Sequence, residues 1–163
     1  MKQKSFEEAL SSLASLCAES EKCKDDITQK AFRWGLSKDD AQKIAERLEE
    51  ENFINELRFA SFYARDKYRF AKWGRKKIEY MLKMKHIPQE YIDKALKEIP
   101  QEDYTEILTD LLRSKVKTTK FSSVQELRAK LFRFCASKGY EIDDISKTVN
   151  NVIKEIKIKE DED

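Results

Sequence analysis

Helix-breaking residues are almost missing from this sequence. Only three glycines and two prolines occur in 163 residues, whereas average usage would give about twenty. Aromatic residues make up 10% of the chain and apolar positions recur throughout, which argues against disorder. No apolar run approaches the length of about 18 residues that a membrane-spanning helix needs. The composition therefore predicts a soluble, highly charged and mostly helical protein.

Capping signals mark several helix starts. Ser5, Ser37 and Ser123 are each followed three residues later by Glu or Asp, which is typical of a helix N-terminus. Apolar residues at helical spacing come after each signal, and no segment alternates as a strand would. We expect an all-α fold of about nine helices, including a long one from about Asn55 to Phe70.

The predicted helices share a register along the chain. Matching apolar positions are Ile27, Leu36, Ala41 and Ile44, and then Ile78, Ile87, Ile92 and Ala95. The spacing predicts three tandem three-helix repeats, at 1–53, 54–99 and 100–158, with an acidic tail at 159–163. Because one such repeat buries little surface alone, neighbours must pack, and we expect an elongated and curved molecule.

The three cysteines favour a reducing compartment. Their number is odd and their spacing irregular, which does not suggest a disulfide framework. Cys17, Cys23, Cys135 and His86 lack the close pairs of a zinc site, so we expect no metal, and Cys17 and Cys135 as core residues. The N-terminus enters an amphipathic pattern without the apolar stretch of a secretory signal. We therefore expect a cytoplasmic protein.

Three stretches resemble the RecX family, whose members regulate the RecA recombinase. Residues 48–60 (LEEENFINELRFA) are similar to the motif between its first two repeats. Residues 73–87 (WGRKKIEYMLKMKHI) and 127–140 (LRAKLFRFCASKGY) resemble its second and third repeats. The positions that carry the resemblance as a structural motif are Asn55, Glu56, Arg58, Phe59, Ala60 and Gly74.

The sequence departs from the family pattern at a few positions. Asn55 and Glu56 stand where the family usually has two aspartates, and Asn55 can still cap a helix. His86 replaces a common Gly at a turn where a left-handed backbone favours Gly.

The resemblance implies function as well as fold. It implies a protein that binds RecA, free or as its filament on single-stranded DNA, and lowers recombinase, ATPase and co-protease activity in DNA repair, recombination and the SOS response. It further implies a protein that catalyses no reaction. We also expect a monomer that needs no cofactor and has no contact with membranes. The residues agree about catalysis, because no Gly-rich phosphate loop, nucleophile elbow or paired histidine occurs.

The positive charge is concentrated in the middle of the chain. The net charge of +2 is the sum of −3 over residues 1–53, +6 over 54–99 and −1 over 100–163. Residues 65–85 alone carry +7, with Tyr68, Phe70, Trp73 and Tyr80 interleaved. Cations neutralise phosphates and aromatic rings stack on unpaired bases, although an acidic protein face or plain solvation would also suit such a segment. We favour a contact surface for the RecA filament or its DNA, formed by Lys67, Arg69, Lys72, Trp73, Arg75, Lys76 and Lys77.

Two further features have a structural and a functional interpretation. Arg58 is expected to pair with Glu51 or Glu56 and fix the connection between repeats. Trp73-Gly74 precedes a helix whose free amides would bind phosphate, unless the two residues only form a turn.

A different class of function is a stand-alone helical nucleic-acid-binding module. The acidic residues at helix starts, such as Asp39 and Asp40, disfavour reading of base edges. Weak direct DNA binding remains compatible with either function.

Overall fold

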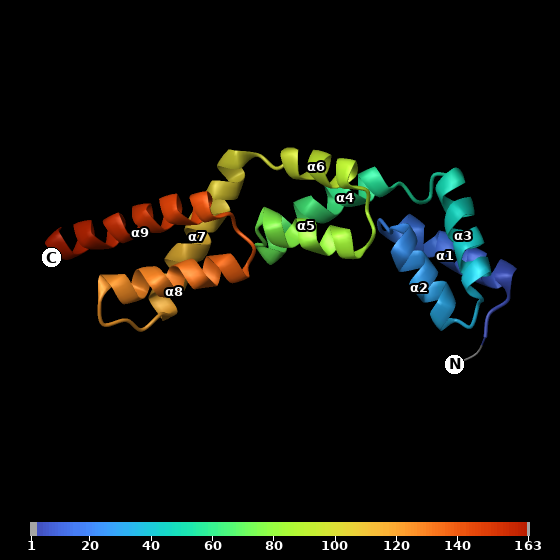
Figure 1. The fold of residues 1–163 in the computed structure, drawn as a ribbon, viewed down its shortest axis with the longest axis horizontal. Helices are drawn as coiled ribbons and strands as arrows, with labels where there is room; N and C mark the ends of the chain where they lie inside the picture. The colour runs from blue at the N-terminus through green and yellow to red at the C-terminus, as the bar shows by residue number, and fades with distance from the viewer. Residues whose placement is uncertain (1–2, 163) are drawn as a thin grey trace. The chain divides into compact units, whose positions relative to one another are not determined.

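The computed structural model describes residues 3–162, apart from the side chains of Ile158 and Glu162, and every regular element in that range is helical (Figure 1). The α-helices are α1 (Phe6–Glu19), α2 (Lys24–Arg33), α3 (Lys38–Glu50), α4 (Glu56–Asp66), α5 (Arg75–Met84), α6 (Gln89–Lys97), α7 (Gln101–Thr118), α8 (Val124–Ser137) and α9 (Ile142–Glu162). The predicted all-α fold is confirmed for the described residues.

The chain divides into two compact units. The first contains the residues up to Tyr63 together with Met81–Ala95, and the second contains Ala64–Tyr80 and the residues from Leu96 onward. In the first unit α1, α2 and α3 pack on one another, and in the second α7, α8 and α9 do so (Figure 1). The helices α4, α5 and α6 are divided between the units. Largest among the fully buried side chains of the second unit are Tyr104 and Tyr140.

The predicted serine caps form. The Ser5 hydroxyl accepts a hydrogen bond from the Glu8 amide at 3.2 Å and starts α1. Ser37 and Ser123 do the same for α3 and α8, each at 3.1 Å. These side chains satisfy amides that have no partner within a first helical turn, so the start of each helix is fixed locally.

The turns between paired helices share one geometry. Gly35, His86 and Gly139 have positive φ angles of 90°, 60° and 91°. The amide after each turn residue returns to the helix it ends: Leu36 to Ala31, Ile87 to Leu82, and Tyr140 to Cys135, at 3.1–3.2 Å. These are the 6→1 hydrogen bonds of a Schellman cap. The pairs α2–α3, α5–α6 and α8–α9 are therefore structurally equivalent, as the sequence register predicts.

The predicted helix from Asn55 to Phe70 is wrong at its C-terminal end. Helix α4 stops at Asp66, and Lys67–Ala71 form a π-helical turn that Lys72 closes at a φ of 57° and a ψ of 42°. The Lys67 carbonyl accepts bonds from the amides of Lys72 and Trp73 instead of continuing α-helical pairing. Since every residue in this turn is a fair helix former, the periodicity gives no sign of the change.

The predicted repeat boundaries and molecular shape stay predictions. In the acidic tail, Glu160–Glu162 continue α9, and Asp163 lies outside the described residues.

Candidate functional site

The π-helical turn exposes part of the predicted contact surface. Phe70 is 78% exposed, and Arg69 and Lys72 are exposed on either side of it, whereas Tyr68 is buried. Arg69 donates to the Tyr68 hydroxyl at 3.1 Å and lies 4.0 Å from Asp103. The turn therefore sends one aromatic ring inward and one outward within three residues.

Trp73 lies beneath two of the predicted lysines. The Lys67 ammonium is 5.0 Å from the indole centroid and the Lys77 ammonium is 4.6 Å away. Both distances suit cation–π attraction. The indole thus brings together two cations ten residues apart in sequence.

Lys138, at the end of α8, lies near Lys72 and Lys77, although the sequence did not indicate it as a contact residue. Its ammonium donates to the Ala71 carbonyl at 3.1 Å. Burial lowers the pKa of Lys138, and the charges of Lys77 and Lys72 lower it further. We call Lys72, Lys77 and Lys138 the lysine cluster. None of the three forms an ion pair with a carboxylate in the part of the chain that the structure describes.

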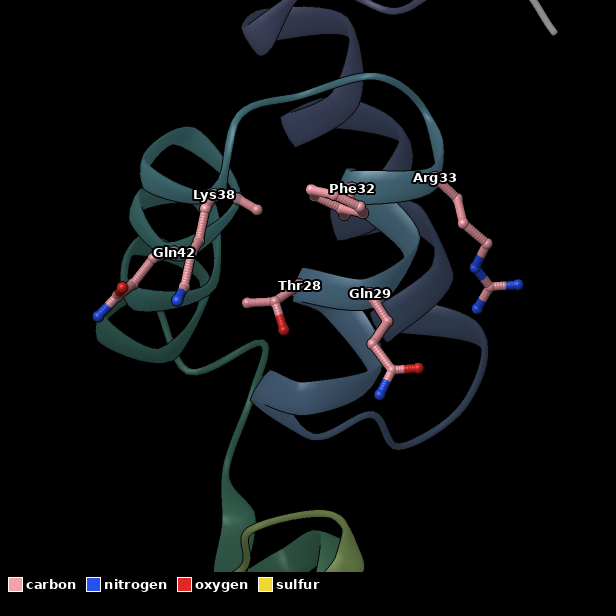
Figure 2. A pocket seen from close by; sticks show the side chains of 7 residues that line it. Thr28, Gln29, Phe32, Arg33, Lys38 and Gln42 are labelled. Carbon is pink, nitrogen blue, oxygen red and sulfur yellow. The ribbon is translucent and has the colours of Figure 1, made fainter.

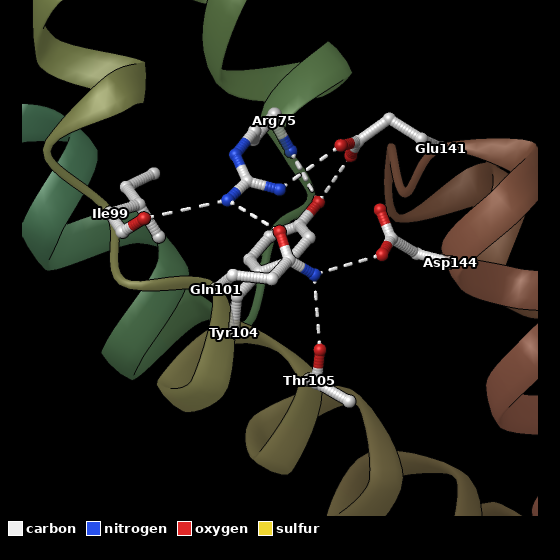
Figure 3. A network of polar contacts seen from close by, with 7 residues as sticks. All are labelled: Arg75, Ile99, Gln101, Tyr104, Thr105, Glu141 and Asp144. Carbon is white, nitrogen blue, oxygen red and sulfur yellow. Dashed lines mark hydrogen bonds and ion pairs between the residues drawn. The ribbon is translucent and has the colours of Figure 1, made fainter.

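Arg75 has a different environment from the other predicted contact residues. Its guanidinium lies 3.9 Å from the Tyr104 ring centroid and pairs with Glu141 at 3.1 Å (Figure 3). It also donates to the Ile99 carbonyl and to Gln101. With its side chain only 19% exposed, Arg75 joins the starts of α5, α7 and α9.

Two neighbouring carboxylates complete this network. The Tyr104 hydroxyl donates to Glu141 at 2.5 Å, and Gln101 donates to Asp144 at 3.0 Å (Figure 3). Burial and the nearby Glu141 raise the pKa of Asp144. The network is a structural junction within the second unit.

Of the two interpretations of Trp73-Gly74, the contacts at the start of α5 favour the turn over the phosphate site, because three of the amides there already have partners. The Gly74 amide donates to the Lys138 carbonyl at 2.8 Å and the Lys76 amide to the Gly139 carbonyl at 3.0 Å. The Arg75 amide donates to the Tyr104 hydroxyl at 2.9 Å. These three amides are therefore closed to a ligand, Gly74 serves the packing of the chain, and the side chains of the segment remain available. Lys76 supplies one of these, since it is exposed and free of ion pairs with described residues.

Asn55 and Glu56 both serve helix starts. The Asn55 side chain accepts the Arg58 amide at 2.9 Å, which is the capping role expected of it. Glu56 is only 8% exposed and accepts the amide of Lys24 at 3.3 Å, at the first residue of α2. Burial raises the pKa of Glu56, although the amide and ammonium of Lys24 oppose this.

Arg58 is structural, but its predicted partners are wrong. Its guanidinium pairs with Glu21 at 2.5 Å and also donates to the carbonyls of Asn52 and Phe53. It therefore ties the connection between α1 and α2 to the one between α3 and α4. Phe59 and Ala60 of the same motif are buried.

The cysteines are free thiols within the first and second units. Cys23 and Cys135 are fully buried, and burial raises the pKa of each thiol to about 12. Cys17 is half-buried. No cluster of three or more metal-binding side chains occurs in residues 3–162, and within that range no helix is long and apolar enough to cross a bilayer.

Comparison with known proteins connects these helices to a family. Residues 55–96 match the second three-helix domain of RecX, and residues 101–149 match the third. The chain belongs to the RecX family. The RecX matches include the junction around Gly74 and the whole basic segment, whereas residues 1–54 lie outside both matched domains.

RecX relatives and structures agree with this assignment. The chain is 32% identical over 124 residues to the regulatory protein RecX of Clostridium perfringens strain 13, covering 75% of this chain and 58% of that protein. It is 25% identical over 135 residues to the regulatory protein RecX of Prosthecochloris aestuarii, covering 82% and 85%. The crystal structure of RecX from Lactobacillus salivarius has the same fold, with a TM-score of 0.76 at 17% identity over 90% of this chain and 96% of that one. The chain thus spans little more than half the length of the clostridial RecX.

Proposed function

We propose that this chain binds the RecA recombinase, free and as its filament on single-stranded DNA, and lowers its recombinase, ATPase and co-protease activities. It acts by binding, as a cytoplasmic monomer, and catalyses no reaction. Membership of the RecX family supports the partner. The observation that carries the proposal is the lysine cluster, which has no carboxylate to balance it within the described chain.

The proposed contact surface consists of Lys67, Arg69, Lys72, Trp73, Lys76 and Lys77, extended by Lys138. Packed cations repel one another, so an anionic partner relieves a cost that the free protein carries. Arg75 is left out of this surface, because its charge is already paired with Glu141 and its role is structural. The filament offers phosphates and acidic side chains, and either would be attracted.

ATP hydrolysis by RecA on single-stranded DNA, titrated with this protein at fixed salt, tests the proposal. We expect inhibition by the natural chain and a half-inhibitory concentration at least about tenfold higher for a K72E/K76E variant. A K94E/K97E variant is the matched control, since it reverses the same charge at two exposed lysines of α6. Equal inhibition by all three proteins would show that the basic surface does not contact RecA or its DNA. No inhibition by the natural chain would contradict the proposal that the protein regulates RecA.

A stand-alone nucleic-acid-binding module is the second candidate. The exposed Phe70 ring beside Lys72 favours it, because aromatic rings stack on unpaired bases and cations hold the backbone. Direct binding to a single-stranded oligonucleotide in a salt series separates the two. Affinity near physiological salt without any effect on RecA would favour the module, and negligible affinity would eliminate it.

A further inference from the structure

The first unit contains a groove that the proposed contact surface does not use. It lies between α2 and α3, encloses about 570 Å³ and is lined by Thr28, Gln29, Phe32, Arg33, Lys38, Ala41 and Gln42. Figure 2 shows the Phe32 ring between the two helices, with Arg33 and Lys38 on the two sides of it. A pocket of this size accepts one or two large side chains.

Phe32 is not required by the repeat. It is 65% exposed, and the carbonyl of Phe32 accepts the amide of the turn residue Gly35. The equivalent carbonyls in the other two helix pairs belong to Lys83 and Ala136, which are exposed. The same turn therefore forms with a solvated lysine or alanine, so it does not require a phenyl ring here. The exposed ring is informative because it lines a groove, and exposed apolar surface in a groove is typical of a binding site.

The charges at the groove are one-sided. Arg33 and Lys38 line it, no carboxylate does, and neither cation forms an ion pair with a side chain that the structure describes. The Gln29 side chain donates to Asp25, one turn earlier in α2, and the Gln42 side chain donates to Glu46, one turn later in α3. An apolar surface with two unpaired cations complements an apolar side chain flanked by carboxylates.

The adjoining part of the groove argues against a nucleic-acid strand. A second hollow continues from Thr28 and Gln42 and is lined by Asp25, Glu46 and Glu56 as well as by Lys24 and Lys85. A run of phosphates needs a continuous basic track and would be repelled there. A peptide of mixed charge meets no such barrier.

We propose that the groove between α2 and α3 binds a segment of the recombinase that carries both kinds of charge, with one large apolar side chain of that segment on Phe32 and its carboxylates beside Arg33 and Lys38. This rests on the proposed function for its partner. It adds a protein-binding site in the residues before 55, which belong to the first unit, whereas the basic surface belongs to the second.

Three variants test the groove. F32A removes the apolar anchor, R33E/K38E reverses the flanking charges, and R33K/K38R keeps the charges. F121A is the matched control, because Phe121 is also exposed, at 40%, and lies in a connection far along the chain. Circular dichroism checks that each variant is folded, and two measurements follow: binding to DNA-free RecA by biolayer interferometry, and half-inhibition of ATP hydrolysis on single-stranded DNA.

We expect F32A and R33E/K38E to bind DNA-free RecA about tenfold more weakly, as loss of an interface anchor typically does. R33K/K38R and F121A should bind like the natural chain. If the natural chain inhibits RecA and F32A does so equally, the groove proposal is overturned and the proposed function stands. If the natural chain has no effect on RecA, both fall. Analytical sedimentation tests whether a second copy of this chain occupies the groove instead. If the natural chain self-associates, F32A abolishes this and RecA binding is unchanged, the groove binds a second copy and the proposal is overturned.

Discussion

Gly74 and Gly139 meet backbone against backbone. A Cβ atom on Gly74 would lie 2.3 Å from the carbonyl carbon of Gly139, far inside contact distance. The adjoining amides of Gly74 and Lys76 donate to the carbonyls of Lys138 and Gly139. Two hydrogen bonds thus join the start of α5 to the end of α8, and only a residue without a side chain permits them.

Replacing Gly74 with alanine should destabilise the protein by about 3 kcal/mol, because the new methyl group meets backbone that cannot rotate away. Urea unfolding followed by circular dichroism measures this. G35A is the comparison, since the three atoms nearest to its Cβ would all belong to the flexible side chain of Gln3, and the change adds mainly the cost of a positive φ. Equal losses in the two variants would contradict the proposed packing role of Gly74.

His86 to glycine should stabilise the protein by about 1 kcal/mol. His86 holds a left-handed φ of 60°, which costs a non-glycine residue roughly this much. Its side chain is 81% exposed, so little packing is lost. The reverse change at the equivalent turn, G139A, should destabilise, because its Cβ would lie 2.4 Å from that of Lys77. Thermal unfolding of both variants should show opposite signs.

Tyr104 to phenylalanine should cost about 2 kcal/mol. The hydroxyl accepts the Arg75 amide at 2.9 Å and donates to Glu141, and its removal leaves both groups without this partner. Tyr80 to phenylalanine is the control, because that ring is 62% exposed. Denaturant unfolding of the two variants should differ by more than the error of the measurement.

Asp26 to asparagine should remove stability that depends on pH. Burial tends to raise the pKa of Asp26, but the hydrogen bond and charge of Lys85 outweigh it and leave the pKa below its usual value. A lowered folded-state pKa stabilises the fold above the unfolded value of about 4, and that contribution disappears as the pH falls through the folded-state pKa. D26N should therefore be less stable than the natural protein by about 1 kcal/mol or more at pH 7. Urea unfolding at pH 7 and pH 3 should show the difference shrinking at the lower pH.

The lysine cluster makes a prediction that needs no partner. Because the charge of Lys77 helps to lower the pKa of Lys138, K77M should raise that pKa. The change is measurable by NMR titration of the lysine side-chain carbons. K94M, on α6, should leave the pKa of Lys138 unchanged. A shift of the same size in both variants would contradict a specific interaction between Lys77 and Lys138.

Local features of the fold were predictable from the sequence. Serine caps and the shared register of the helix pairs depend on residues three to nine positions apart, and they stand where the sequence indicated. His86 at a left-handed turn belongs to the same class. These features follow from the stereochemistry of single turns.

The features that sequence reasoning missed depend on distant contacts or on a subtle change of helix type. Lys138 meets Ala71 across 67 positions, and Arg58 meets Glu21 across 37. Neither pairing leaves a trace in local spacing, so the sequence suggested nearer partners for Arg58 and none for Lys138. The amides expected to be free at the start of α5 have distant partners: those of Gly74 and Lys76 donate to Lys138 and Gly139, and that of Arg75 donates to Tyr104 across 29 positions. The sequence showed that the segment is aromatic and basic, but it did not show which of its cations pair with carboxylates and which do not.

The exposed turn around Phe70 is fastened through its main chain. Tyr140 and Lys138 both donate to carbonyl oxygens, of Lys72 and Ala71, and would do so whatever side chains those two positions carried. Mutation can therefore exchange the outward-facing residues at little cost to folding, as it does in hypervariable loops. The side chains of this turn can therefore change during evolution to match a changed partner, while the backbone conformation of the turn is kept.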